Sequence, residues 1–180
     1  PFFDRERRRE LEPTVRAIAE ELLEELLADV GPVGTEIDAV AALGAVFAVR
    51  AQTAWLGWPS RLEPELLQWM VDNHEASRSG ELARTAEVAE RFDAIIRSVV
   101  APRRALGDDA PEDLTTELMR VPLPDPGIPG SHERGLEDEE VVSILRNWTG
   151  GDLGSIALCT GVLLTAVARA PELAERLRVG

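Results

Sequence analysis

The segment NWTGGDLGSIALC, residues 147–159, lies inside the longest helical pattern of the chain and decides the fold. From Leu136 to about Ala168 the sequence is apolar, and it opens with the acids LEDEE, which suit the positive end of a helix. Rising about 1.5 Å per residue, this pattern predicts a helix about 45 Å long. Three glycines, Gly150, Gly151 and Gly154, interrupt the middle of that helix.

These glycines weaken the helix, so they require an explanation. Each one costs about 0.5 to 1 kcal/mol relative to alanine, and together they cost about 2 to 3 kcal/mol. One explanation is close packing, in which a crossing helix occupies the space of the missing side chains. The other is that a flat ligand lies against the bare backbone. A loosened turn would also free a carbonyl to bind water, and such local bulges gather at functional sites.

The rest of the chain also favours helices, and no segment alternates with the period of two that marks a strand. Helical patterns are expected over residues 5–30, 38–56, 63–76, 81–100, 113–120, 136–168 and 171–178. Residues 121–135, VPLPDPGIPGSHERG, are rich in proline and glycine and are expected to form a loop. The sequence therefore predicts an all-α chain.

Composition and charge exclude several classes of function. The net charge of −14 repels phosphate backbones, so we expect no nucleic-acid partner. No uninterrupted apolar stretch of about 20 residues occurs, so we expect no membrane partner. The chain starts at Pro1 without an initiator Met or a signal region, and we expect a cytoplasmic protein cut from a longer polypeptide. Cys159, the only cysteine, lies in an apolar run and is expected to be a small buried hydrophobic residue.

The residues around the glycines resemble a known family. Residues 136–178, LEDEEVVSILRNWTGGDLGSIALCTGVLLTAVARAPELAERLR, resemble the long distal helix and the following helix of bacterial cytochrome P-450 enzymes, the haem-thiolate monooxygenases. The start, PFFDRERRRELEPTVRAIAEELLEELL, is similar to the helix that follows the family's propionate-binding helix. IDAVAALGAVFAVRAQTAWLGWPS is similar to the next helix, which commonly ends Leu-Gly-x-Pro. The two helices over 63–100 match the lid pair above the substrate pocket.

The resemblance covers essentially all 180 residues in order, and it implies a fold. Residues 1–180 are expected to form part of a cytochrome P-450 domain: a helical core with one long distal (I-type) helix. In the family this helix carries Ala/Gly-Gly-x-Asp/Glu-Thr, whose glycine leaves room for haem and dioxygen. Gly150 and Gly151 match the first two positions. The resemblance implies that Gly150, Gly151 and Gly154 bind the cofactor, haem (iron-protoporphyrin IX).

The family's acid and alcohol, which deliver protons, are displaced in this chain. Leu153 stands at the acid position and Gly154 at the alcohol position. Either Asp152 and Ser155, three apart and so on one helix face, act as the catalytic pair through a shifted bulge, or the usual relay is absent. Two other readings of Asp152 are that it points toward a polar substrate or that it hydrates an exposed turn. The resemblance further implies that Trp148, Leu153 and Trp69 contact the substrate.

The family's activity is the insertion of one oxygen atom of O2 into a small organic substrate, with electrons from a ferredoxin-type donor. The family ligates iron through a cysteine in a Phe-x-x-Gly-x-x-x-Cys-x-Gly loop, and the 180 residues contain no such loop. Cys159 lies on the distal helix, in the wrong element for this role. The haem ligand is therefore expected outside the chain, which holds no metal ligand and is expected to be inactive alone.

A function from a different class remains open. The chain also fits a haem-free helical module, a degenerate relative that binds a small hydrophobic molecule or a protein. An unrelated helical ligand-binding domain, such as that of a transcription regulator, is a third and more distant alternative.

Overall fold

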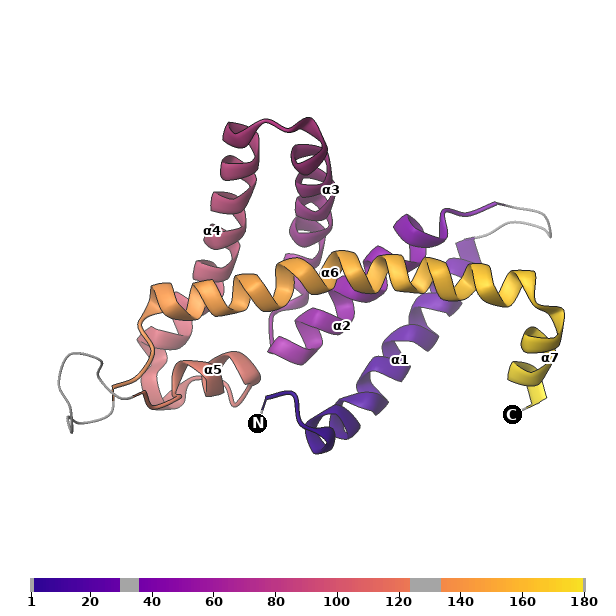
Figure 1. The fold of residues 1–180 in the computed structure, drawn as a ribbon. Coiled ribbons are helices and arrows are strands. Elements are labelled where there is room, and N and C mark those ends of the chain that lie inside the picture. The colour runs from indigo at the N-terminus through magenta and orange to yellow at the C-terminus, as the bar shows by residue number, and fades with distance from the viewer. Residues whose placement is uncertain (1, 30–35, 124–133, 180) are drawn as a thin grey trace.

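The long helix α6 runs along the fold, and η1, α2 and α4 make most of its contacts (Figure 1). The structure is a computed structural model that describes residues 2–29, 36–123 and 134–179. Its α-helices are α1 (Arg5–Asp29), α2 (Val46–Leu56), α3 (Glu63–Ser79), α4 (Leu82–Leu106), α5 (Leu114–Met119), α6 (Asp138–Arg169) and α7 (Pro171–Val179). The π-helix η1 (Ala39–Ala45) and the 3-10 turns η2 (Ser60–Leu62) and η3 (Gly107–Asp109) complete the described elements. The all-α prediction is confirmed, because these ranges hold no strand and only one isolated bridge, Leu123 to Arg134.

Two features stabilise α6: the hydrogen bonds of its first turn and one buried face. The Glu137 and Glu140 side chains each accept a hydrogen bond from the other's backbone N–H, which satisfies donors that the helix start leaves unpaired. The buried face carries residues three or four apart: Val141, Val142, Leu145, Thr149, Leu153 and Ala157. They pack against η1, α2 and α4. After Ala157 the helix holds no buried residue, and its apolar side chains there are exposed.

The helix expected over residues 38–56 is found in two parts. Its first turns form the π-helix η1, capped by the Asp38 carboxylate, which accepts from the backbone N–H groups of Val40 and Ala41. The regular helix α2 follows and ends at Gly57, whose φ of 73° suits glycine. The π-helix η1 approaches α6 closely at Gly44. A Cβ on Gly44 would lie 2.5 Å from the Ala157 carbonyl oxygen. Side-chain periodicity does not reveal a π-helix, because its cause is this contact with a distant segment.

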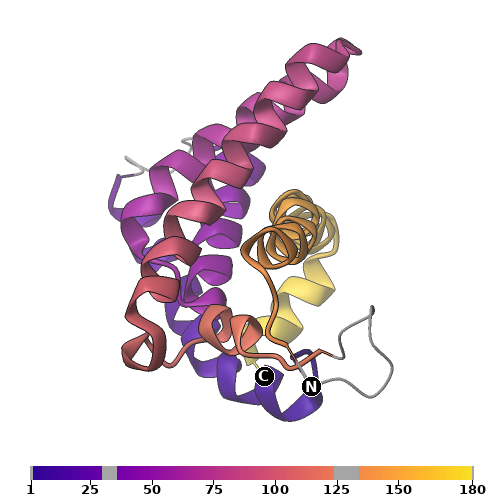
Figure 2. The ribbon, with the colours of Figure 1, turned by 90° about the vertical axis from the view of Figure 1, so that its left-hand side faces the viewer.

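α3 and α4 form an antiparallel hairpin that projects away from α6 (Figure 2). Gly80, with a φ of 72°, reverses the chain between them. The indole of Trp69 stacks on the ring of Phe92 with centroids 4.0 Å apart, and its N–H donates to the Val88 carbonyl at 3.0 Å. This stack joins the two helices near their crossing with α6.

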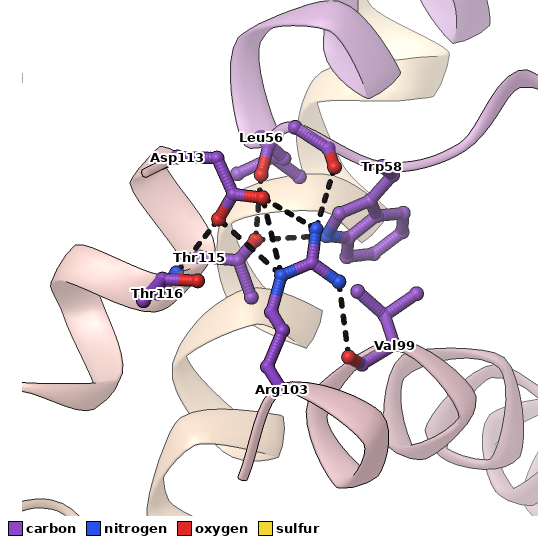
Figure 3. A network of polar contacts seen from close by, with 8 residues as sticks. Leu56, Trp58, Val99, Arg103, Asp113, Thr115 and Thr116 are labelled. Atoms are coloured by element: carbon purple, nitrogen blue, oxygen red, sulfur yellow. Dashed lines mark hydrogen bonds and ion pairs between the residues drawn. The ribbon is translucent and has the colours of Figure 1, made fainter. Parts of the chain in front are cut away.

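The prediction that α4 ends at Val100 is wrong, because the helix continues through Pro102 to Leu106. Its last turn is held by Arg103, which extends into a buried polar network (Figure 3). Tertiary contacts of this side chain offset the hydrogen bond that proline removes from the helix. In the expected loop over 121–135, residues 124–133 lie outside the described part, as does residue 30 of the first expected helix.

Two stretches are long and apolar enough to cross a membrane, judged by length and composition alone: Ala39–Leu56 and Asp138–Arg169. Core helices of soluble proteins pass the same test, and both stretches contribute to the core here. The expectation of no membrane partner therefore stays a prediction.

Candidate functional site

The three glycines of α6 have different surroundings. A Cβ added to Gly151 or Gly154 would meet no atom within 4 Å, so both glycines face open space. A Cβ on Gly150 would instead lie 3.6 Å from the Trp69 ring and 3.5 Å from the Phe92 ring. These are ordinary contact distances, so the α3–α4 hairpin covers Gly150 without requiring a glycine there. Neither explanation offered from the sequence fits all three positions.

Gly151, Gly154 and Ser155 lie on one exposed face of α6, which we call the glycine face. The Ser155 hydroxyl donates a hydrogen bond of 2.8 Å to the Gly151 carbonyl oxygen, one turn earlier. The carbonyl that a loosened turn would free is therefore already paired with a side chain. α6 stays α-helical throughout this segment, so the shifted bulge expected around Asp152 and Ser155 is absent from the described helix.

Asp152 is turned to another side of the helix, about 100° from Gly151 at 3.6 residues per turn. Its carboxylate lines an apolar cavity of about 310 Å³ between α1, α2 and α6. Asp152 is exposed to solvent, and partial desolvation by its neighbours raises the pKa of its carboxyl above the usual value. Asp152 is thus offset from Gly151 but lies only about 60° from Ser155 around the helix, at the edge of the glycine face.

The three residues expected to contact substrate are not brought together. Leu153 is fully buried in the core, on the face of α6 opposite Gly151. Trp69 is buried in the α3–α4 hairpin and touches the side of Gly150. Trp148 is half-buried in an aromatic cluster at the start of α1, with ring centroids 5.0 Å from Phe3 and 5.9 Å from Trp55.

Cys159 is exposed, so the prediction that it is a buried hydrophobic residue is wrong. The apolar run around it indicated burial, but Cys159 lies on a side of α6 that no described element covers. No group of three or more His, Cys, Asp and Glu side chains that could hold a metal ion occurs among the described residues. If the chain contributes to a haem site, its part is a surface beside the cofactor.

The glycine face fits the flat side of a porphyrin. Gly151 and Gly154 are about 4.5 Å apart along the helix axis, and neither carries a side chain that would hold a planar group away. The apolar residues Leu158 and Val162 extend the same exposed stripe. Cofactor sites are concave and mostly apolar, so the described residues supply at most one wall of such a site.

Sequence reasoning missed the residues of the cavity beside Asp152. Phe47, Ala51 and Gln52 of α2 line it together with Leu11 and Val15 of α1. Helical periodicity places these residues on inward faces, but it does not reveal which two helices leave a space between them. The sequence also does not reveal that the side-chain nitrogen of Gln52 is buried without a hydrogen-bond partner among the described residues.

Comparison with protein-family models gives no match, and comparison with curated protein sequences gives no significant match.

Proposed function

We propose that this chain supplies the distal haem face and the substrate lid of a cytochrome P-450 monooxygenase. One observation carries the proposal: Gly151 and Gly154 stand in the interior of a 32-residue helix and face open space. No contact among the described residues requires a glycine at either position.

The energetics support an absent neighbour on this face. Two interior glycines lower the stability of a helix by about 1 to 2 kcal/mol relative to alanine. No packing contact in the described structure offsets this loss. A flat group that lies against the bare backbone explains why glycine stands at both positions. The resemblance to the P-450 distal helix identifies that group as haem.

In this proposal, each face of α6 has its own task. Gly151 and Gly154 leave room for the porphyrin, and the α3–α4 hairpin roofs a small organic substrate. The Ser155 hydroxyl lies beside Gly151, where rotation away from the carbonyl oxygen would present its proton to the glycine face. The nearby Asp152 carboxyl, whose pKa is raised, holds a proton more readily than an ordinary aspartate.

A thiolate-ligated haem supplies the activation of dioxygen, with electrons from a ferredoxin-type donor. The proposal places the axial cysteine outside these 180 residues, because Cys159 lies beyond the glycine face on α6 itself. It also places the intact enzyme in the cytoplasm.

The decisive experiment is the carbon-monoxide difference spectrum of the complete, reduced polypeptide. A thiolate-ligated haem gives a far-red-shifted Soret band, and we expect this band. A spectrum without haem, or with a histidine-type band, would overturn the proposal.

Substitutions on α6 then test which face the haem uses. Gly151→Leu should lower haem content or weaken the substrate-induced spectral change, since its side chain fills the glycine face. Gly150→Ala is the matched control, because its methyl group meets only ordinary contacts with the lid hairpin. Equal haem content and equal substrate spectra in both variants would contradict the placement of the porphyrin.

The proton-delivery role is tested separately. Asp152→Asn should divert reducing equivalents from product to hydrogen peroxide, because the amide cannot donate and recover a proton. Unchanged coupling of electrons to product would remove Asp152 from that role.

A second function, a haem-free module that binds a small hydrophobic molecule, is favoured by the apolar cavity between α1, α2 and α6. Its volume of about 310 Å³ is at the lower end of the range for small-molecule sites. The carbon-monoxide spectrum separates the two functions, because this second function predicts no haem signal.

A further inference from the structure

The cavity beside Asp152 is walled by apolar side chains from three helices and from the segment before α1. Its apolar and aromatic lining consists of Phe2, Phe3, Leu11, Val15, Phe47, Ala51, Trp55 and Ile156. It lies on a different side of α6 from the glycine face. A ligand of this cavity is therefore separate from the proposed haem.

Two polar groups in the wall lack protein partners. The Asp152 carboxylate makes no hydrogen bond or ion pair with any residue in the described ranges. Gln52 is only 4% exposed, and its side-chain amide nitrogen is buried without a hydrogen-bond partner among the described atoms. A buried donor without a partner costs about 1 to 3 kcal/mol, so such a group in a cavity wall indicates a ligand that accepts from it.

Asp152 shares the cavity lining with two arginines, Arg7 and Arg8, and neither of them makes an ion pair with it. Arg7, which also lines the cavity, is already paired with Glu117 at 2.6 Å. Arg8 directs its Nε toward the Asp4 carbonyl oxygen at 3.3 Å. Asp152 is thus the one lining carboxylate, and its only resolved influence is loss of water.

The aromatic rings complete the site. Phe3 and Trp55 pack with centroids 5.1 Å apart in the cavity wall, and their faces attract alkylammonium groups as well as apolar ones. An ammonium group between a carboxylate and aromatic rings is a recurrent arrangement of amine recognition.

We propose that this cavity binds an apolar primary amine that also carries a hydrogen-bond acceptor. The ammonium group donates to the Asp152 carboxylate, the apolar body lies against Phe47 and Trp55, and the acceptor meets the Gln52 amide. This inference does not rest on the proposed monooxygenase function, since it concerns the haem-free chain.

The test is titration calorimetry on the 180-residue chain with three matched probes. The first is 3-phenoxypropylamine. In 3-phenoxypropan-1-ol a neutral hydroxyl replaces the ammonium, and in 4-phenylbutylamine a methylene replaces the ether oxygen. We expect the phenoxy amine to bind about fivefold more tightly than the alcohol, with a smaller preference over 4-phenylbutylamine.

Variants then assign each preference to one residue. Asp152→Asn should abolish the preference for amine over alcohol, whereas Asp108→Asn, on the exposed turn η3, should keep it. Gln52→Leu should abolish the preference for the ether oxygen and keep the preference for the amine. Equal binding of amine and alcohol, or an unchanged amine preference in Asp152→Asn, would overturn the proposal; a CO spectrum without haem would leave it standing.

Discussion

At the scale of single residues, the glycines of this chain divide by what surrounds them. Gly44 and Gly161 lie where η1 crosses α6, and added Cβ atoms there would come within 2.5 Å of the Ala157 oxygen and 2.6 Å of a Val40 methyl group. Gly151 and Gly154 meet nothing. Gly44 and Gly161 allow η1 and α6 to pack closely. Gly151 and Gly154 instead leave part of the α6 surface bare of side chains.

This division predicts opposite effects of the same substitution. Gly44→Ala should destabilise the chain by about 1 to 3 kcal/mol, because the methyl group collides with backbone and the two helices must separate. Gly154→Ala should stabilise it by about 0.5 to 1 kcal/mol through helix propensity alone. Urea denaturation of the three proteins, followed by circular dichroism, measures both. Two changes of the same sign would contradict the distinction.

The sequence predicted that the α6 glycines matter, because glycine inside a long helix is visible in any helical pattern. It did not predict which of them face space, because that depends on Trp69 and Phe92 from another part of the chain. The prediction that Cys159 is buried was wrong for the same reason, because an apolar run is buried only where another element covers it.

At the scale of elements, one buried polar network holds three helices together. The Arg103 guanidinium at the end of α4 pairs with the Asp113 carboxylate and donates to the Gly57 carbonyl oxygen at 2.6 Å (Figure 3). Asp113 also accepts from the Thr116 N–H and so caps α5. The neighbouring Thr115 hydroxyl donates to the α2 carbonyl of Leu56 at 2.7 Å.

Breaking this network should unfold the protein more readily. Asp113→Asn keeps an acceptor for the α5 cap but leaves the buried Arg103 charge unpaired, and we expect a loss of about 3 kcal/mol. In the double variant Arg103→Met, Asp113→Asn, less should be lost than the sum of the single changes, since no unpaired charge remains. A double-mutant cycle by urea denaturation measures the coupling, and additive losses would contradict it.

The hydrogen bonds of Glu140 at the start of α6 predict that the stability of the chain depends on pH. Hydrogen bonds from Arg134 and from the Glu137 backbone lower the pKa of Glu140 from 4.5 to about 2. A lowered carboxyl pKa contributes stability that is complete above the ordinary pKa and is lost as pH falls through the lowered one. The stability difference between the wild-type chain and Glu140→Gln should therefore be constant above about pH 5. It should shrink as the pH approaches 2, and a difference that persists at pH 2 would contradict the assignment.

The elements themselves were largely predictable, because long apolar periodicity and Gly or Pro at the ends are local signals. Two details were not. The extension of α4 through Pro102 depends on Arg103 and its distant partners, and the π-helix η1 depends on the crossing with α6. No local pattern encodes a contact between residues 10 to more than 100 positions apart.

At the scale of the whole molecule, the buried core stops while α6 continues. Leu158, Val162 and Leu163 are 62 to 67% exposed, although they belong to a long apolar helix. Contiguous exposed apolar patches of this kind mark surfaces that contact another protein part or a membrane. The proposed monooxygenase explains the patch, because its remaining helices and haem would lie against this side of α6.

The exposed patch predicts that the isolated, folded 180-residue chain binds a hydrophobic dye such as ANS. The double variant Leu158→Gln, Leu163→Gln should lose most of the fluorescence, because it removes the two largest members of the patch. Leu82→Gln is the matched control: Leu82 is 86% exposed but lies apart, at the start of α4. If the control lost as much fluorescence as the double variant, the dye would be reporting scattered apolar residues. A loss confined to the double variant would locate an uncovered apolar surface on the part of α6 that follows the glycine face, where the proposed function places the rest of the enzyme.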